Sequence, residues 1–223
     1  HIAKDKNLLR VEKTDLTKMA LWIKDRFNLF GFRAFEYKAK ADKYKRTPMA
    51  KYKLGVLKKA YKSSIRTYSS SELSCKSECH MYMTQTKATL QNDLYTIMIS
   101  FVFEEKGQLY EYQFLGLFPT DVYDSDPLSL PWLKRKVDAV HTLAGSHMSQ
   151  FRRKSINKIV RMLPRDELFL SSERDLYMLV MSIFSQQGRR AIEINIRNDR
   201  YSHFLSCFIM MPPDSYTSKL QHS

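Results

Sequence analysis

The spacing of apolar and polar residues predicts strands in the first half of the chain and helices in most of the second half. An apolar stripe at helical spacing runs through residues 14–27, with Thr14 or Asp15 available as N-cap. Later segments are rich in aromatic and β-branched residues and predict strands. These segments are 28–39, 80–88, 94–103 and 108–118. Residues 104–107 separate the last two segments, which therefore predict a hairpin.

The second half has helical periodicity after a loop over residues 119–131. Pro131 is expected to begin a helix that ends at Gly145, because proline suits a first helical position and glycine a C-terminal cap. Further helices are predicted from about 149 to 163 and from 172 to 187. The carboxylates of Asp166 and Glu167 favour the start of a helix, where the dipole is positive.

A strand with clean alternation is predicted at residues 190–197. Three isoleucines, Ile192, Ile194 and Ile196, face one side, and Glu193, Asn195 and Arg197 face the other. We predict that the isoleucine side is buried and that Glu193 faces solvent. A turn at 198–200 and a returning strand complete this second pair of strands.

The sequence Gly145-Ser146-His147-Met148 resembles the short remnant that a cleaved purification tag leaves on a protein. It therefore raises the question whether two proteins are joined at this point. Gly145 can end one helix, and Ser146 or Ser149 can cap the next. A natural helix-turn-helix needs such residues, so no junction is required.

Composition indicates a folded chain and excludes a membrane span. The 223 residues are 43% hydrophobic and 13% aromatic, enough for a packed core. No uncharged apolar run reaches the roughly 18 residues that a spanning helix needs. The absence of a secretory signal and the three cysteines, an odd number, predict a reducing, cytoplasmic location.

The net charge of +14 raises nucleic acid as a partner. The densest basic stretch, residues 38–62, has Tyr44, Tyr52 and Tyr61 interleaved, but no recognisable nucleic-acid-binding motif accompanies it. A solvated lysine-rich surface is the favoured interpretation, a nucleic-acid-binding module is the alternative, and the role of the stretch stays open.

The glycines exclude nucleotide-binding turns. No two of the six are closer than nine positions, whereas a dinucleotide-binding turn needs three within six residues. The Gly-x-Ser-x-Gly nucleophile motif and the His-Glu-x-x-His zinc motif are also absent. We therefore predict no catalytic and no cofactor-binding residues.

Zinc is the one metal for which candidate ligands can be named. Cys75, Cys79 and His80 lie close together, and His203 and Cys207 repeat a four-residue spacing. This pattern is a loose match to known zinc spacing, and a cysteine in a strand is usually a small hydrophobic residue. We therefore predict no metal site.

Several segments resemble the bacterial large-subunit NAD-specific glutamate dehydrogenases, in the long N-terminal regulatory portion of those enzymes. The resemblance is most specific at "PRDELF" (164–169) together with "RNDRYSHFLSC" (197–207). It also includes "WIKDRFNLFGFRAFEY", "LGVL", "TKA", "QFLGLF" and "LPWLKRKVDAV", in that order along the chain. It is weaker over residues 38–85, which are more basic than the family pattern, and residues 89–95 lack the family's Arg- and His-containing run.

The resemblance implies a part of an enzyme that oxidises L-glutamate to 2-oxoglutarate and ammonia with NAD. It implies that the catalytic domain and its NAD site lie downstream, and that the partners are other domains and subunits of an oligomer. An amino-acid effector is implied as well, because such N-terminal portions contain ACT-like and PAS-like modules.

The resulting expectation is an α+β chain. Residues 14–125 are predicted to form a PAS-like antiparallel sheet, 131–187 a helical connection, and 190–223 the truncated hairpin of an ACT-like domain. The predicted role is regulatory or architectural.

Overall fold

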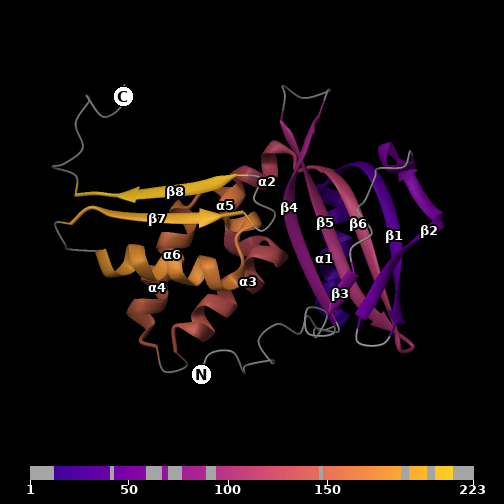
Figure 1. Ribbon diagram of the computed structural model, residues 1–223. Coiled ribbons are helices and arrows are strands. Elements are labelled where there is room, and N and C mark those ends of the chain that lie inside the picture. The colour runs from indigo at the N-terminus through magenta and orange to yellow at the C-terminus, as the bar shows by residue number, and fades with distance from the viewer. Residues whose placement is uncertain are drawn as a thin grey trace. The chain divides into compact units, whose positions relative to one another are not determined.

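The computed structural model describes residues 13–40, 43–58, 67–69, 77–88, 94–145, 148–186, 191–199 and 204–212 (Figure 1). The fold is α+β, as predicted. The chain divides into two compact units, His1–Asp124 and Ser125–Ser223, and each is described by itself.

The first unit is an antiparallel sheet with short helices. Six strands pair in the order β3-β2-β1-β6-β5-β4. The elements are α1 (Lys13–Arg26), β1 (Asn28–Lys40), β2 (Lys43–Gly55), the 3-10 turn η2 (Val56–Lys58), β3 (Thr67–Ser69), β4 (Ser77–Lys87), β5 (Tyr95–Glu105), β6 (Gln108–Leu117) and α2 (Thr120–Asp124).

The hairpin between β5 and β6 confirms the predicted turn. Glu105 pairs with Gln108, so two residues, Lys106 and Gly107, connect the strands. Both have positive φ, 51° and 79°, which is the geometry of the tight turns that match the twist of paired strands.

One helical stripe of α1 is buried, as its periodicity predicts. Met19 and Ile23 lie on that stripe, and Phe27, the next residue after the helix, is also buried. The ring of Phe27 packs edge-on against Phe118, with ring centroids 5.0 Å apart. Because a side chain at Gly116 would collide with Phe27 and with the backbone of Asn28, glycine lets β6 approach this corner closely.

The basic stretch 38–62, in which the sequence pattern predicts no particular element, contains the strand β2. Its sequence lacks an apolar alternation, but it pairs with β1 from Gly31–Gly55 to Lys40–Lys43. Residues 43–55 therefore form a strand because they pair with β1, a central strand of the sheet, rather than because of their own composition. The serine-rich composition of residues 63–78 predicts a loop, whereas 67–69 form β3 and 77–78 begin β4. The rest of that stretch lies outside the described residues.

The second unit consists of helices followed by a hairpin. The elements are η3 (Pro127–Ser129), α3 (Pro131–Leu143), α4 (Gln150–Met162), α5 (Arg165–Leu170), α6 (Glu173–Gln186), β7 (Glu193–Asn198) and β8 (Leu205–Met210). The segment 119–131, predicted as a loop, contains two short helical pieces, α2 and η3. Asp126 caps η3 by accepting the backbone N–H of Leu128 at 3.1 Å, a local contact that stabilises a single turn.

The core of this unit joins the helices on both sides of Gly145. Val137 and Val140 of α3 and Ile156 and Ile159 of α4 are all buried. Gly145 has φ of 114°, and the Ser149 hydroxyl accepts the Arg152 N–H at 3.3 Å as the N-cap of α4. The helix-turn-helix therefore uses Gly145 as a native turn residue.

The orientation of β7 reverses the prediction. Its residues alternate as expected, but Ile192, Ile194 and Ile196 are exposed, whereas Glu193 and Arg197 are partly buried. The physical reason is that the polar side finds partners on the helices: Glu193 accepts hydrogen bonds from Ser182 and Gln186 of α6. Figure 1 shows β7 and β8 side by side along these helices.

Candidate functional site

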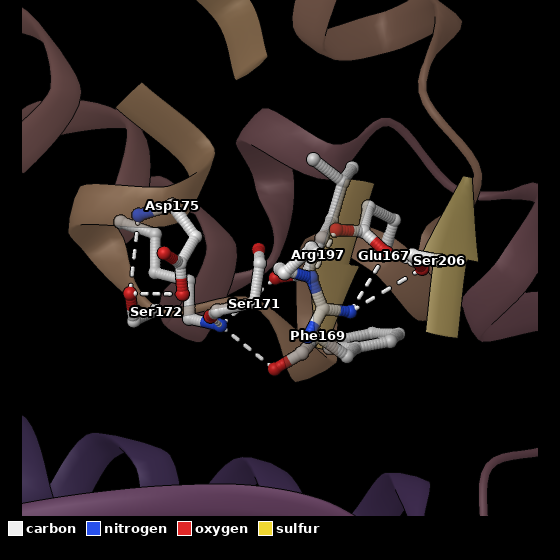
Figure 2. A network of polar contacts seen from close by, with 9 residues as sticks. Glu167, Phe169, Ser171, Ser172, Asp175, Arg197 and Ser206 are labelled. Carbon is white, nitrogen blue, oxygen red and sulfur yellow. Dashed lines mark hydrogen bonds and ion pairs between the residues drawn. The ribbon is translucent and has the colours of Figure 1, made fainter. Parts of the chain in front are cut away.

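The most extensive polar network of the second unit centres on Glu167 of α5 and Arg197 of β7. The guanidinium donates from Nε to Glu167 Oε1 at 2.6 Å and from Nη2 to Oε2 at 2.8 Å. The hydroxyl of Ser206 in β8 donates to the same Oε2 at 2.6 Å. Figure 2 shows Glu167 and Ser206 on the same side of the Arg197 guanidinium, joined to it by dashed lines. One carboxylate thus holds both strands of the hairpin on α5.

Burial gives this pair its strength. The side chains of Arg197 and Glu167 are only 10% and 5% exposed. The Glu167 hydrogen bonds hold the pKa of Arg197 above its ordinary value, against the opposing effect of burial. A charge pair that is bidentate and removed from water is costly to break, because removing one partner leaves the other buried and unmatched.

Lys136 of α3 fixes the other end of α5. Its buried ammonium donates to the backbone carbonyls of Leu168, Phe169 and Ser171 at 2.9, 2.7 and 2.6 Å. The last carbonyls of a helix have no partner within the helix and carry the negative end of its dipole. Lys136 therefore satisfies them with all three of its N–H bonds.

The next helix begins beside this contact. The Ser172 hydroxyl accepts the Asp175 N–H at 3.1 Å and donates to the Asp175 carboxylate at 2.6 Å, which caps the start of α6. In Figure 2 this pair lies on one side of the network and the Glu167–Arg197 contact on the other. The short helix α5 is consequently held by a cation at its C-terminal carbonyls and by Arg197 through Glu167 in its first turn.

The first unit contains a second buried carboxylate, Glu111 of β6. Tyr37 donates its hydroxyl to Oε2 at 2.7 Å, Arg46 approaches Oε2 at 3.2 Å, and Ser100 donates to Oε1 at 2.6 Å. Gln113 also donates to Oε1 and accepts from Arg33 Nε at 2.7 Å. Burial alone would raise the pKa of Glu111, but Arg46 and the hydrogen bonds outweigh it and lower the pKa.

This polar cluster lies between two apolar ones on the same face of the sheet. Tyr37, Val102 and Leu109 pack on one side, and Leu57, Met98 and Leu115 on the other. The guanidinium of Arg46 also lies over the ring of Phe35, 4.4 Å from its centroid. Arg46 comes from the basic stretch 38–62, so part of the positive charge of that stretch has a structural partner.

The cysteines and histidines considered as zinc ligands are only partly within the described residues. Cys79 and His80 lie in β4, half-buried, and Cys207 lies exposed in β8. Cys75 and His203 fall outside the described residues. Within the described ranges, no three His, Cys, Asp or Glu side chains are grouped as metal ligands. In the same ranges no helix is long and apolar enough to cross a bilayer.

In both polar networks, around Glu111 and around Glu167, a buried carboxylate is paired with a guanidinium. The carboxylates of Glu111 and Glu167 each accept hydrogen bonds at both oxygens, and each faces a guanidinium. A general base needs an oxygen available to the proton that it takes. The geometry therefore suits the fastening of elements to one another better than proton transfer.

Sequence reasoning missed Glu111, Lys136 and the Glu167–Arg197 pair. One signal for Glu111 was present: Glu111 and Gln113 alternate in phase with Leu109 and Leu115, so polar residues occupy inward positions of β6. The pairing of Glu167 with Arg197 joins the two most specific motifs of the sequence, 164–169 and 197–207. Spacing alone could not reveal a contact across 30 residues.

Comparison with known proteins gives one family profile and several curated relatives. The profile "Glutamate dehydrogenase, helical motif 1" matches residues 130–189, which span α3 to α6 and include Lys136 and Glu167. The NAD-specific glutamate dehydrogenase of Halomonas elongata is 26% identical over 212 residues, covering 89% of this chain and 13% of the relative.

Two further relatives cover about half of the chain. The NAD-specific glutamate dehydrogenase of Pseudomonas aeruginosa is 29% identical over 109 residues, 49% of this chain and 7% of the relative. The NAD-specific glutamate dehydrogenase of Mycobacterium tuberculosis is 29% identical over 115 residues, which cover 52% of this chain and 7% of the relative. The chain thus spans a small share of the length of these relatives.

Proposed function

Because the chain is related to the NAD-specific glutamate dehydrogenases, we propose that it forms a non-catalytic, regulatory or architectural part of an enzyme of that family. The parent reaction would be the NAD-dependent oxidation of L-glutamate to 2-oxoglutarate and ammonia. Catalysis and NAD binding would belong to another part of the polypeptide. The glycine spacing supports this division, because it cannot form a dinucleotide-binding turn here.

The observation that carries the proposal is the Glu167–Arg197–Ser206 contact. It fastens the hairpin to the helical segment that matches the family profile. Residues that hold elements together, rather than converge on a substrate, are expected of a part that transmits or maintains structure. We therefore favour subunit assembly over small-molecule sensing, and binding of an amino-acid effector is the second candidate role.

Module assignments are part of the same proposal. The six-stranded antiparallel sheet would be PAS-like, and the β7–β8 hairpin would belong to an ACT-like module. The partners would be other domains and subunits of the parent enzyme, in the cytoplasm. The basic stretch would be a solvated surface, with Arg46 as its structural exception.

Activity and binding assays on the purified chain test the proposal. We expect no NADH production from glutamate and no increase of the melting temperature with NAD. Robust turnover would contradict the non-catalytic role. Screening L-amino acids by thermal shift separates the two remaining roles, since an effector raises the melting temperature in a concentration-dependent way.

A full-length relative provides the complementary test. In a Halomonas elongata enzyme whose matching segment is replaced by this chain, Glu167→Gln is expected to change assembly or effector response. Affinity for NAD should be unchanged. A loss of NAD affinity with intact assembly would instead place this region in the catalytic machinery.

A further inference from the structure

Positive charge on the exposed side of α4 has few partners. The helix has no acidic residue among its 13 positions, and its basic residues are Arg152, Arg153, Lys154, Lys158 and Arg161. Arg161 forms the exposed ion pair with Asp126. Among the side chains that the structure describes, none forms an ion pair with Arg153, Lys154 or Lys158, all of which are exposed. These three cations therefore face solvent without a described counter-charge.

This charge is unfavourable for the helix that carries it. Arg152 and Arg153 lie in the first turn, where the positive end of the helix dipole disfavours cations. Lys154 and Lys158 are four positions apart, and Lys158 and Arg161 are three apart, so like charges are neighbours on one side of the helix and repel each other. The stability of α4 therefore does not explain why these residues are basic, whereas contact with a negative partner does.

Two large apolar side chains flank the basic ones. Phe151 and Met162 are each 76% exposed. Because about eleven positions make three turns of an α-helix, both side chains lie on the same side of α4, about 16 Å apart along its axis. Lys154, Lys158 and Arg161 lie between them, within roughly a third of the helix circumference. We call these residues, from Phe151 to Met162 on this side, the α4 stripe.

We propose that the α4 stripe binds an acidic protein segment in which carboxylates lie between two apolar side chains. Carboxylates opposite Lys154 and Lys158 would offset the repulsion between the two ammonium groups, so that binding stabilises the helix itself. Apolar groups of the segment would cover Phe151 and Met162, which otherwise remain in water. The charge of the stripe thus selects the sign of the partner, and its two apolar ends select the spacing of the partner's apolar side chains.

The ends of the stripe favour a protein partner over nucleic acid or a membrane. A phosphate backbone would neutralise the lysines, but Met162 has no ring on which a base could stack. A helix that lies on a bilayer inserts a broad apolar face into it. The corresponding face of α4, which contains Ile156 and Ile159, is buried in the core of its unit.

Fluorescence anisotropy of a labelled synthetic peptide with the whole chain tests the inference. The peptide has two leucines at the spacing of Phe151 and Met162, with glutamates between them on the same helical side. We expect it to bind, and to bind more weakly as salt is added, because the attracting charges are exposed. The same peptide with glutamine in place of each glutamate should not bind.

Charge reversal distinguishes the stripe from the net charge of the chain. Lys154→Glu should weaken binding of the acidic peptide at least about fivefold. The matched control is Lys134→Glu, which makes the same change of charge at an exposed position of α3 and should alter the affinity less than about twofold. Phe151→Ala should also weaken binding, since it removes one apolar end of the stripe.

The melting temperature of the free chain separates a binding role from a structural one. In Lys154→Glu a carboxylate lies near the positive end of the dipole and four positions before Lys158, so the melting temperature should rise slightly while binding weakens. A lower melting temperature in this variant would mean that Lys154 stabilises the fold, and it would overturn the inference.

Other results would overturn it as well. Failure of the acidic peptide to bind would show a solvated surface, and equal weakening in Lys154→Glu and Lys134→Glu would show attraction to the net charge alone. Tighter binding of an oligothymidylate, or of phosphatidylserine vesicles, than of the peptide would assign the stripe to nucleic acid or to a membrane. The inference goes beyond the proposed function, and the assay involves neither free L-glutamate nor NAD. Turnover by the purified chain would therefore contradict the proposed function and leave the α4 stripe untouched.

Discussion

Arg197 of β7 and Glu167 of α5 form a bidentate ion pair, with donor–acceptor distances of 2.6 and 2.8 Å, that joins the hairpin to the helices of the second unit. Both side chains are nearly buried. The same unit contains an exposed bidentate pair, Arg161 with Asp126, whose side chains are 49% and 46% exposed. The two pairs have the same chemistry in different solvent environments.

Replacement of Arg197 by methionine should lower the free energy of unfolding of the second unit by about 3 kcal/mol, since Glu167 is then left buried without its partner. Arg161→Met should cost less than about 1 kcal/mol, because water screens the exposed pair. Urea unfolding followed by Trp132 fluorescence in a Trp22→Phe background reports this unit alone. Equal losses in both variants would show that burial does not determine the strength of the pair.

Lys136 provides a second prediction about α5. Lys136→Met keeps most of the aliphatic stem and removes the donor to three carbonyls, so it should cost about 2–3 kcal/mol in the same assay. The neighbouring Lys134 is exposed, and Lys134→Met should change the free energy of unfolding by less than about 0.5 kcal/mol. A small loss in Lys136→Met would indicate that water replaces the ammonium at the helix end.

The pH dependence of the first unit should depend on Glu111. The pKa of Glu111 is lowered from its ordinary 4.5 in the folded state, so the unfolded chain binds the proton more tightly. The stabilisation from this group is therefore fully present above about pH 4.5 and is lost as the pH falls through the folded pKa. Measurement requires urea unfolding at several acidic pH values, followed by Trp22 fluorescence in a Trp132→Phe background.

Glu111→Gln identifies the source of that slope. It should lower the free energy of unfolding by about 3 kcal/mol at neutral pH, because Arg46 stays buried without its counter-charge. It should also flatten the dependence of stability on pH below about 4.5. An unchanged slope would mean that other carboxylates cause the acid sensitivity of this unit.

Local patterns predicted the elements whose apolar period matches their structure. The apolar period of α1 coincides with its buried side, which contains Met19 and Ile23, and Val140 of α3 and Ile156 of α4 are buried in the same way. In these elements the apolar residues face the interior, so period and burial agree. The alternation in β7 was equally clear.

The side of β7 that is buried could not be predicted from its own sequence. An alternating pattern shows that the two faces of a strand differ in polarity, and the apolar face is usually the buried one. In β7 the polar face is the buried one. Arg197 and Glu193 face inward because their hydrogen-bond partners, Glu167 and Ser182, lie in the helices α5 and α6. Long-range pairing of this kind, like that of β2 with β1, is determined by the assembled fold.

Gly145 offers the final prediction, which concerns the turn between α3 and α4. Its φ of 114° is in a region that residues with a side chain rarely adopt, yet a Cβ placed there would meet no atom within 4 Å. The cost of Gly145→Ala is therefore purely conformational, roughly 1–3 kcal/mol. Ala144→Gly, at the adjacent residue with an ordinary φ of −74°, is the matched control and should cost at most about 1 kcal/mol.

Trp132 lies in α3, so its fluorescence in the Trp22→Phe background reports on the unit that contains this turn. The transition should remain single in Gly145→Ala and move to lower urea, because Val140 and Ile156 on the two sides of the turn share one core. If Gly145 instead marked a junction between unrelated segments, alanine would leave the midpoint unchanged. Protease would then cut the chain near residue 145 into two pieces that unfold independently.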